Sequence, residues 1–268
     1  MQETVQGLAV ITGAASGMGE AAARLMAEAG WTLLILDLNA ERVEQAADRL
    51  RAHGHVEVLA GDIADPRFHD ALVAALAERP VGAFIHCAGL SPTMAEPARI
   101  LEVNLAATMR LLNVVRPRMA QGAAAVLFAS SAGYMIGTAL DLQIANAATP
   151  DAVSDLMAVS PNSGLAYSVS KRGVHLLVRR EAAGFGQRGA RIVSISPGII
   201  DTPMGRAEME SHPIMKVLVE NSPLKRSAQA EEVAAVAVFL CSPAASFVTG
   251  IDILVDGGAM AMTPAQPG

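Results

Sequence analysis

Short apolar runs alternate with stretches of helical periodicity along most of the chain. The runs are rich in Val, Ile and Leu and are bounded by glycine or polar residues, which is typical of buried strands. They predict strands at 7–11, 31–37, 56–61, 81–88, 123–131, 191–196 and 251–255, with helices at 20–29, 40–53, 66–78, 97–119, 165–188 and 230–241. This alternation predicts an α/β fold, a Rossmann-type doubly wound parallel sheet with helices on both faces, in three layers.

The pattern predicts a single domain over residues 1–268, because no repeat or change of composition divides it. That length is enough for one large core. A helical insertion is expected at about 137–163. Thr149, followed by Pro150 and Asp151, resembles a helix N-cap with proline at the first helical position, so a short helix is expected to begin there.

A glycine-rich turn joins the first strand to an alanine-rich helix. The free N–H groups and the dipole at such a helix start favour an anion such as a pyrophosphate. The second strand ends at Asp37, followed by Leu38, where a carboxylate can hold the hydroxyls of a ribose. The turn residues expected to bind a dinucleotide are Gly13, Ser16, Gly17, Met18 and Gly19.

Tyr167 and Lys171 are four residues apart in a predicted helix, so they lie one turn apart on the same face. An ammonium group beside a phenol favours the phenolate and lowers the pKa of the tyrosine. Tyr167 is therefore a candidate proton donor and acceptor near neutral pH.

Together these features resemble the short-chain dehydrogenase/reductase family, over about residues 5–258 and with several motifs in the family's order. The resemblance implies that Tyr167 exchanges a proton with the substrate oxygen, Ser131 hydrogen-bonds that oxygen, Lys171 holds the nicotinamide ribose and Asn104 anchors a water. It implies further cofactor contacts from Asp62, Ile63, Cys87, Ala88, Gly89, Tyr167, Lys171, Pro197, Gly198, Ile200 and Thr202.

Two features depart from the family pattern. Cys87 stands where an asparagine is usual, and we expect it to be an unreactive buried thiol. The 36 positions from Ser131 to Tyr167 leave room for the insertion, which resembles that of bacterial 3α-hydroxysteroid dehydrogenase/carbonyl reductase. We expect the insertion to form a wall of the substrate cleft, so that its apolar residues face the substrate, residues 199–219 or another subunit. The alternative is a helical hairpin that packs only on its own domain. The apolar residues are Leu140, Leu142, Ile144, Val153, Leu156 and Met157, and the methionines expected opposite them are Met204, Met209 and Met215.

Composition narrows the partners. The formal net charge is −6 and no basic stripe is present, which argues against nucleic acid. No apolar run approaches the ~18 residues of a membrane span. No signal-peptide pattern is present and only two cysteines occur, so a cytoplasmic protein is expected. The histidines show no ligand spacing, and no metal is assigned.

The sequence thus predicts an NAD-dependent enzyme that interconverts a secondary alcohol and a ketone, with a bulky or cyclic apolar substrate. A homodimer or homotetramer is expected. Two alternatives remain open: a 3-oxoacyl thioester reductase, and a non-catalytic NAD(H)-binding regulatory protein on the same fold.

Overall fold

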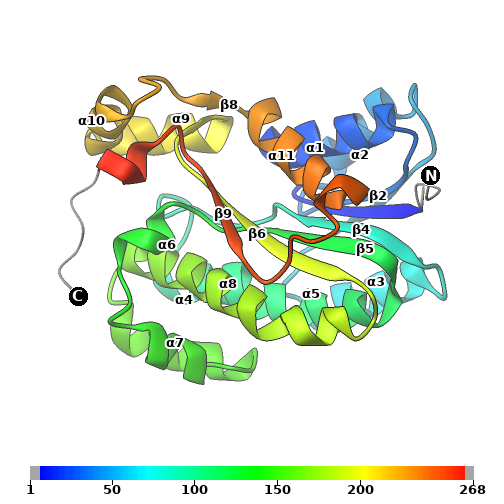
Figure 1. Ribbon diagram of the computed structural model, residues 1–268, viewed down its shortest axis with the longest axis horizontal. Helices are drawn as coiled ribbons and strands as arrows, with labels where there is room; N and C mark the ends of the chain where they lie inside the picture. Colours follow the sequence, from blue (N-terminus) through cyan, green and yellow to red (C-terminus); the bar gives the residue numbers. More distant parts are fainter. Residues whose placement is uncertain (1–6, 263–268) are drawn as a thin grey trace.

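The computed structural model describes residues 7–262, so the two ends of the predicted domain lie outside the described residues. Its centre is a seven-stranded, wholly parallel sheet in the order β3-β2-β1-β4-β5-β6-β9 (Figure 1). The strands are β1 Leu8–Thr12, β2 Thr32–Asp37, β3 Val56–Ala60, β4 Val81–His86, β5 Met119–Phe128, β6 Arg191–Pro197 and β9 Asp252–Val255.

Helices cover both faces of the sheet (Figure 1). One layer packs on one face and consists of α1 Gly17–Glu28, α2 Ala40–Leu50 and α11 Ala230–Cys241. The other layer consists of α3 Pro66–Leu76, α4 Pro97–Leu101, α5 Ala107–Val115 and α8 Ser163–Gly186. The predicted fold class is confirmed.

The core explains why the strands read as unbroken apolar runs. Within β1, Leu8 and Val10 face the layer of α8, whereas Ala9 and Ile11 face the layer of α1. Both faces of the strand are buried, because successive side chains point to opposite sides of a covered sheet.

Side-chain caps begin several of the predicted helices. The Asn39 side chain accepts from Arg42 N at the start of α2, and the Asn162 side chain accepts from Leu165 N at the start of α8. These bonds satisfy N–H groups that have no partner within the helix. The helix that carries Tyr167 therefore begins at a defined residue.

The prediction of one helix over 97–119 is wrong in two respects. A π-helix, η1 Glu102–Ala106, lies between α4 and α5, and a short 3-10 turn, η2 Arg116–Arg118, follows α5. Pro117 lies inside η2, where a proline cannot continue an α-helix. Strand β5 therefore begins at Met119, earlier than predicted.

Helix α6 Ala132–Met135 precedes the insertion, which folds as α7 Asp141–Asn146 and the 3-10 helix η3 Asp151–Val159. Thr149 Oγ1 accepts from Ala152 N at 3.3 Å, so the predicted capping threonine does lie at a helix start. Ile144, Val153 and Leu156 are buried in the core layer of α8. The expectation that these residues need the substrate, residues 199–219 or another subunit is wrong, because their own domain covers them.

A second group of elements lies between β6 and α11. It contains a two-stranded parallel ribbon, β7 Ile200–Asp201 and β8 Ala228–Gln229, together with α9 Pro203–Ser211 and α10 Ile214–Asn221. In Figure 1, α9 and α10 lie beyond the carboxyl end of β6, on the other side of the sheet edge from α4 and α6. The remaining short helices are η4 Pro243–Ala245 and η5 Ala259–Met262.

Candidate active site

The glycine-rich turn leaves β1 and enters α1 at the carboxyl edge of the sheet. A Cβ on Gly13, whose φ is +68°, would lie 2.8 Å from the backbone N of Ala88, and one on Gly19 would lie 2.1 Å from Gly13 O. Ser16 is the N-cap of α1, but its side chain makes no capping hydrogen bond. The backbone N–H groups at this helix start therefore have no side-chain acceptor from Ser16. They can donate to a bound anion, and such a group of donors fits a pyrophosphate.

Asp37 lies beside this turn at the end of β2. Its carboxylate accepts from Ala15 N at 3.0 Å and from Asn39 N at 3.3 Å. Within residues 7–262 no cation forms an ion pair with Asp37, and Leu38 is exposed. The site therefore offers a negative charge at the place expected for a ribose.

A buried histidine that the sequence reasoning missed connects the turn to the catalytic side. His86 Nε2 lies 2.8 Å from Thr108 Oγ1, and Thr108 Oγ1 donates to Asn104 O at 2.9 Å. Thr108 must therefore accept from His86 Nε2–H, which leaves Nδ1 to accept from Thr12 Oγ1 at 2.7 Å. Burial lowers the pKa of His86 to about 3, so this ring is neutral. Its signal in the sequence is a lone histidine closing an apolar strand run.

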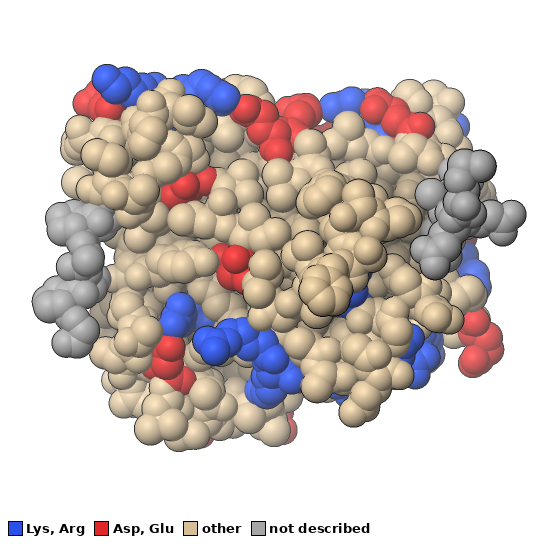
Figure 2. Space-filling view, in the orientation of Figure 1, with Lys and Arg blue, Asp and Glu red and all other residues tan. Residues whose placement is uncertain are grey.

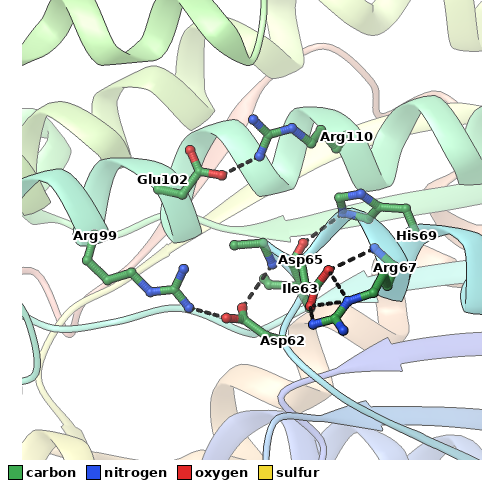
Figure 3. A network of polar contacts seen from close by, with 9 residues as sticks. Asp62, Ile63, Asp65, Arg67, His69, Arg99, Glu102 and Arg110 are labelled. Carbon is green, nitrogen blue, oxygen red and sulfur yellow. Dashed lines mark hydrogen bonds and ion pairs between the residues drawn. The ribbon is translucent and has the colours of Figure 1, made fainter.

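Asp62 and Ile63 follow β3, the neighbour of β2 in the sheet (Figure 3). Asp62 accepts from Ala64 N at 2.9 Å, and Arg99 of α4 reaches its other oxygen at 2.5 Å. The Ile63 carbonyl accepts from His69 Nε2 at 2.7 Å. Both residues are thus held in place, although an ion pair with Arg99 occupies the carboxylate that was expected near an adenine.

The segment after β4 approaches the predicted catalytic residues closely. A Cβ on Gly89 would lie 3.1 Å from Asn104 Oδ1 and 3.5 Å from Lys171 Nζ. Burial raises the pKa of the Cys87 thiol well above its usual range, which agrees with an unreactive cysteine. Ala88 N donates to Thr12 Oγ1 at 3.1 Å.

Asn104 lies in the π-helix η1, and its side chain is fully engaged. Its Oδ1 accepts from Leu90 N at 2.7 Å, and its Nδ2 donates to Leu90 O at 2.9 Å. The extra residue of a π-turn aims a side chain differently from an α-helix, and such turns are frequent at functional sites. Here the turn places the Asn104 side chain against the segment that follows Gly89.

Tyr167 and Lys171 lie on one face of α8, as predicted, with Lys171 Nζ 5.6 Å from the centre of the Tyr167 ring. Lys171 Nζ donates to Phe128 O at 2.9 Å, and burial lowers the pKa of Lys171 to about 8. The expected lowering of the Tyr167 pKa by Lys171 is wrong. Burial raises the pKa of Tyr167, a hydrogen bond from Ser130 opposes this, and the negative charge of Glu208 adds to the rise.

The serine that contacts Tyr167 is Ser130, whereas the sequence prediction named its neighbour Ser131. Ser130 hydrogen-bonds Tyr167. Ser131 is the N-cap of α6, where its backbone N donates to Pro197 O at 3.0 Å. Two adjacent serines look alike in a sequence. They differ here because the chain turns from β5 into α6 between them, and the position of that turn depends on the register of β5.

The predicted carboxamide-binding segment follows β6. A Cβ on Gly198 would lie 2.7 Å from the Cα of Asp256, so only glycine fits there. Thr202 is the N-cap of α9 and accepts from Gly205 N at 3.0 Å. A Cβ on Gly17 would lie 3.3 Å from Thr202 Cγ2, so this segment and the glycine-rich turn meet. Pro197, at the end of β6, and Ile200, in β7, are both buried.

A largely apolar cavity of about 790 Å³, counting its open mouth, adjoins this segment. Ser131 and Met135 line one side, and α10 supplies Leu218 and Val219. Neither the residues of the insertion from 137 onward nor Met204, Met209 and Met215 line it. The predicted wall and its opposing methionines are therefore wrong for this cavity, because α7 and η3 pack on α8 instead.

Comparisons with known proteins agree with this fold. The sequence model of the short chain dehydrogenase family matches residues 7–159, and a model described as enoyl-(acyl carrier protein) reductase matches residues 151–260. The chain therefore belongs to the short-chain dehydrogenase/reductase family and is an oxidoreductase of that family.

Relatives cover nearly the whole chain. It is 30% identical to a 3-alpha-hydroxysteroid dehydrogenase/carbonyl reductase of Comamonas testosteroni, over 96% of this chain and 98% of the relative. It is 34% identical to a cis-4-hydroxycyclohexanecarboxylate dehydrogenase of Sinomonas cyclohexanicum, over 94% and 95%. The structure of a 3-alpha-hydroxysteroid dehydrogenase from Pseudomonas sp. B-0831 complexed with NADH is similar, with a TM-score of 0.80, 28% identity, and coverage of 97% and 100%.

No helix within residues 7–262 is long and apolar enough to cross a membrane. No group of His, Cys, Asp and Glu side chains in that part of the chain could hold a metal ion.

Proposed function

We propose that this protein is an NAD(H)-dependent oxidoreductase that interconverts a secondary alcohol and a ketone, with bulky or cyclic substrates. The observation that carries the proposal is the convergence of Tyr167, Ser130, Lys171 and Asn104 beside a turn that fits a pyrophosphate. A purely regulatory protein has no need for this constellation.

The residues divide the chemistry among them. When bound, the dinucleotide supplies or accepts the hydride. Tyr167 gives a proton to the carbonyl oxygen, or takes it from the alcohol. Ser130, already hydrogen-bonded to the phenol, donates to the same substrate oxygen and takes the role first expected of Ser131. Lys171 supplies a positive charge next to Tyr167 and holds the nicotinamide ribose.

The cofactor preference rests on Asp37. Its carboxylate can accept from the 2′- and 3′-hydroxyls of an adenosine ribose, and it would repel a 2′-phosphate. The pyrophosphate would lie at the amides of Gly17 to Gly19, the adenine near Asp62 and Ile63, and the nicotinamide near Gly198, Ile200 and Thr202. Cys87, Ala88 and Gly89 would line the cleft between these places.

The substrate proposal rests on the cavity and the relatives. Met135, Ile199 and Leu218 give the cavity an apolar wall next to Ser131. The names of two relatives describe ring substrates that carry a secondary alcohol. A cyclic ketone meets both conditions, because its ring can bind against the apolar wall of the cavity, next to the serine pair that includes Ser130.

Homo-oligomerisation and a reducing compartment complete the proposal. The middle of the face that carries β9 and β6 is mostly uncharged (Figure 2). Phe239 of α11 is exposed, and so are Phe247 and Ile251, which precede β9 in the sequence. Such a patch is typical of an interface, which supports a homodimer or homotetramer. Both cysteines are free thiols, which supports the cytoplasm.

One experiment tests the proposal. NADH oxidation is measured with cyclohexanone, a steroid ketone, acetone and a 3-oxoacyl thioester, and each is repeated with NADPH. We expect turnover with NADH, and a higher kcat/KM for the cyclic ketones than for acetone. Preference for the thioester would favour an acyl thioester reductase, and NADH binding without any turnover would favour a regulatory protein.

A further inference from the structure

Helix α9 buries one of its residues, and that residue is a carboxylate. Glu208 is 8% exposed, whereas every other residue from Pro203 to Ser211 is exposed or half-buried. Glutamate is among the residues that proteins bury least, because loss of its hydration is costly unless partners replace the water. The burial of Glu208 therefore needs partners that hold it.

Those partners lie in the segment that follows β4, 115 positions away in the sequence. The Glu208 carboxylate accepts from Thr93 N at 3.1 Å and from Thr93 Oγ1 at 2.5 Å. Hydrogen bonds from Ser91 and Thr93 keep the pKa of Glu208 below its ordinary value although burial alone would raise it, so the group is ionised near neutral pH. Bonds to a charged acceptor are stronger than neutral ones.

The segment that receives Glu208 is itself fixed to the catalytic side. Leu90, just before Ser91, is held on both its N–H and its carbonyl by the Asn104 side chain. Ser163 Oγ, at the start of α8, donates to Ala95 O at 2.9 Å. A carboxylate on α9 is thus joined to the two elements that carry Asn104 and Tyr167.

The rest of α9 has few other attachments. It packs on β7 and on α10, which lie on its own side of the cleft. The negative charge of Glu208 also contributes to raising the pKa of Tyr167, which agrees with a position near the phenol. The contact with Thr93 therefore joins α9 to the segment that is bonded to the catalytic side.

We propose that Glu208 is a positioning residue that fastens α9 across the substrate cleft through Thr93. With this contact, α9 forms a closed side of the site in which Tyr167 meets the substrate. Without it, α9 moves away and the substrate is held less well. This inference deepens the proposed function and rests on it for its kinetic consequences.

The test compares four variants. Glu208→Ala removes the contact, Glu208→Gln keeps an acceptor but removes the charge, and Thr93→Val removes the hydroxyl donor but keeps the backbone N–H. Glu210→Gln is the matched control, because Glu210 is exposed on the same helix two residues further on. Each is measured for kcat and KM with NADH and cyclohexanone, and for amide hydrogen exchange over residues 203–211.

We expect Glu208→Ala to raise KM about tenfold or more, with a smaller change in kcat, and to lose exchange protection in α9. Thr93→Val and Glu208→Gln should change both quantities in the same direction by less, and Thr93→Val should add little in the Glu208→Ala background, where its partner is already lost. Glu210→Gln should resemble the wild type. A KM and an exchange pattern in Glu208→Ala that match those of Glu210→Gln would overturn the proposal.

Failure of the proposed function gives a different result. If the wild-type protein turns over no ketone with NADH, the function is wrong, but exchange in α9 still decides whether Glu208 holds the helix. If Glu208→Ala does not fold, Glu208→Gln and Thr93→Val carry the same comparison. Unchanged α9 exchange in both would overturn the proposal.

Discussion

The two neighbouring serines give the sharpest test of the site. Ser130 hydrogen-bonds Tyr167, whereas Ser131 caps α6 and lines the apolar cavity. We predict that Ser130→Ala lowers kcat strongly and that Ser131→Ala does not. In the proposed mechanism Ser130 and Tyr167 hydrogen-bond the same substrate oxygen, on which negative charge develops during reduction. Ser131 makes no such bond.

The magnitude follows from the contacts of each hydroxyl. Loss of one donor to a developing oxyanion costs about 10²–10³ in kcat, or about 2.7–4 kcal/mol. Ser130 Oγ also accepts from Ala132 N at 3.2 Å, and loss of this neutral bond should cost only about 0.5–1.5 kcal/mol of folding stability. The protein should therefore remain folded while it loses activity. Ser131→Ala should change KM for cyclic ketones by no more than a few-fold.

The assay measures kcat and KM with NADH and cyclohexanone, NADH affinity from fluorescence, and stability from urea denaturation. The NADH affinity of both variants should stay close to that of the wild type. If Ser131→Ala were the variant with the large loss of kcat, the assignment of Ser130 would be refuted. If Ser130→Ala unfolded the protein, the prediction that this variant loses activity while it remains folded would be refuted.

Three further predictions concern the acid, the cofactor and the core. Tyr167→Phe should lower kcat about 10²–10⁴-fold and leave NADH binding nearly intact, and a variant that kept a tenth of the activity would contradict the role of Tyr167. Because Asp37 has no cationic partner within residues 7–262, kcat/KM should favour NADH over NADPH by at least about tenfold. Asp37→Ala should narrow this ratio, and equal kcat/KM values for the two cofactors in the wild type would contradict the role of Asp37. Leu156→Ala should lower the free energy of unfolding by about 2–5 kcal/mol and the control Leu142→Ala by no more than about 0.5 kcal/mol, as urea denaturation would show; equal losses would mean that the insertion does not pack as described.

The prediction for Leu156 replaces one that the structure contradicts. Apolar residues at 137–163 are too many for a solvated loop, and this much of the reasoning holds. They pack against α4 and α8 of the same domain, so the insertion stabilises the helix that carries Tyr167. Of the six apolar residues, Leu142 is the most exposed and is free to meet another subunit.

The sequence by itself predicted the strands of the central sheet, most of the helices that cover it and the sheet edge that carries the candidate site. Buried parallel strands require unbroken apolar runs, and turns at their ends require glycine or polar residues, so the pattern alone located the seven strands of the central sheet to within a few residues. It did not predict the ribbon of β7 and β8 or helices α9 and α10. The carboxyl ends of parallel strands share one edge, and this placed Asp37, Gly89 and Gly198 together before any coordinates. The four-residue spacing placed Tyr167 and Lys171 on one helical face.

Only the tertiary structure decided which polar groups meet. Ser130 and Ser131 differ by where β5 gives way to α6, and that depends on sheet register. His86 acquires its role because Thr12 and Thr108, which are far apart in the sequence, come within hydrogen-bond distance of its ring. Glu208 reads as one of several surface acids until α9 lies against Thr93. Local periodicity carries no information about such contacts, because they join segments whose separation in space is set by the packing of the whole sheet.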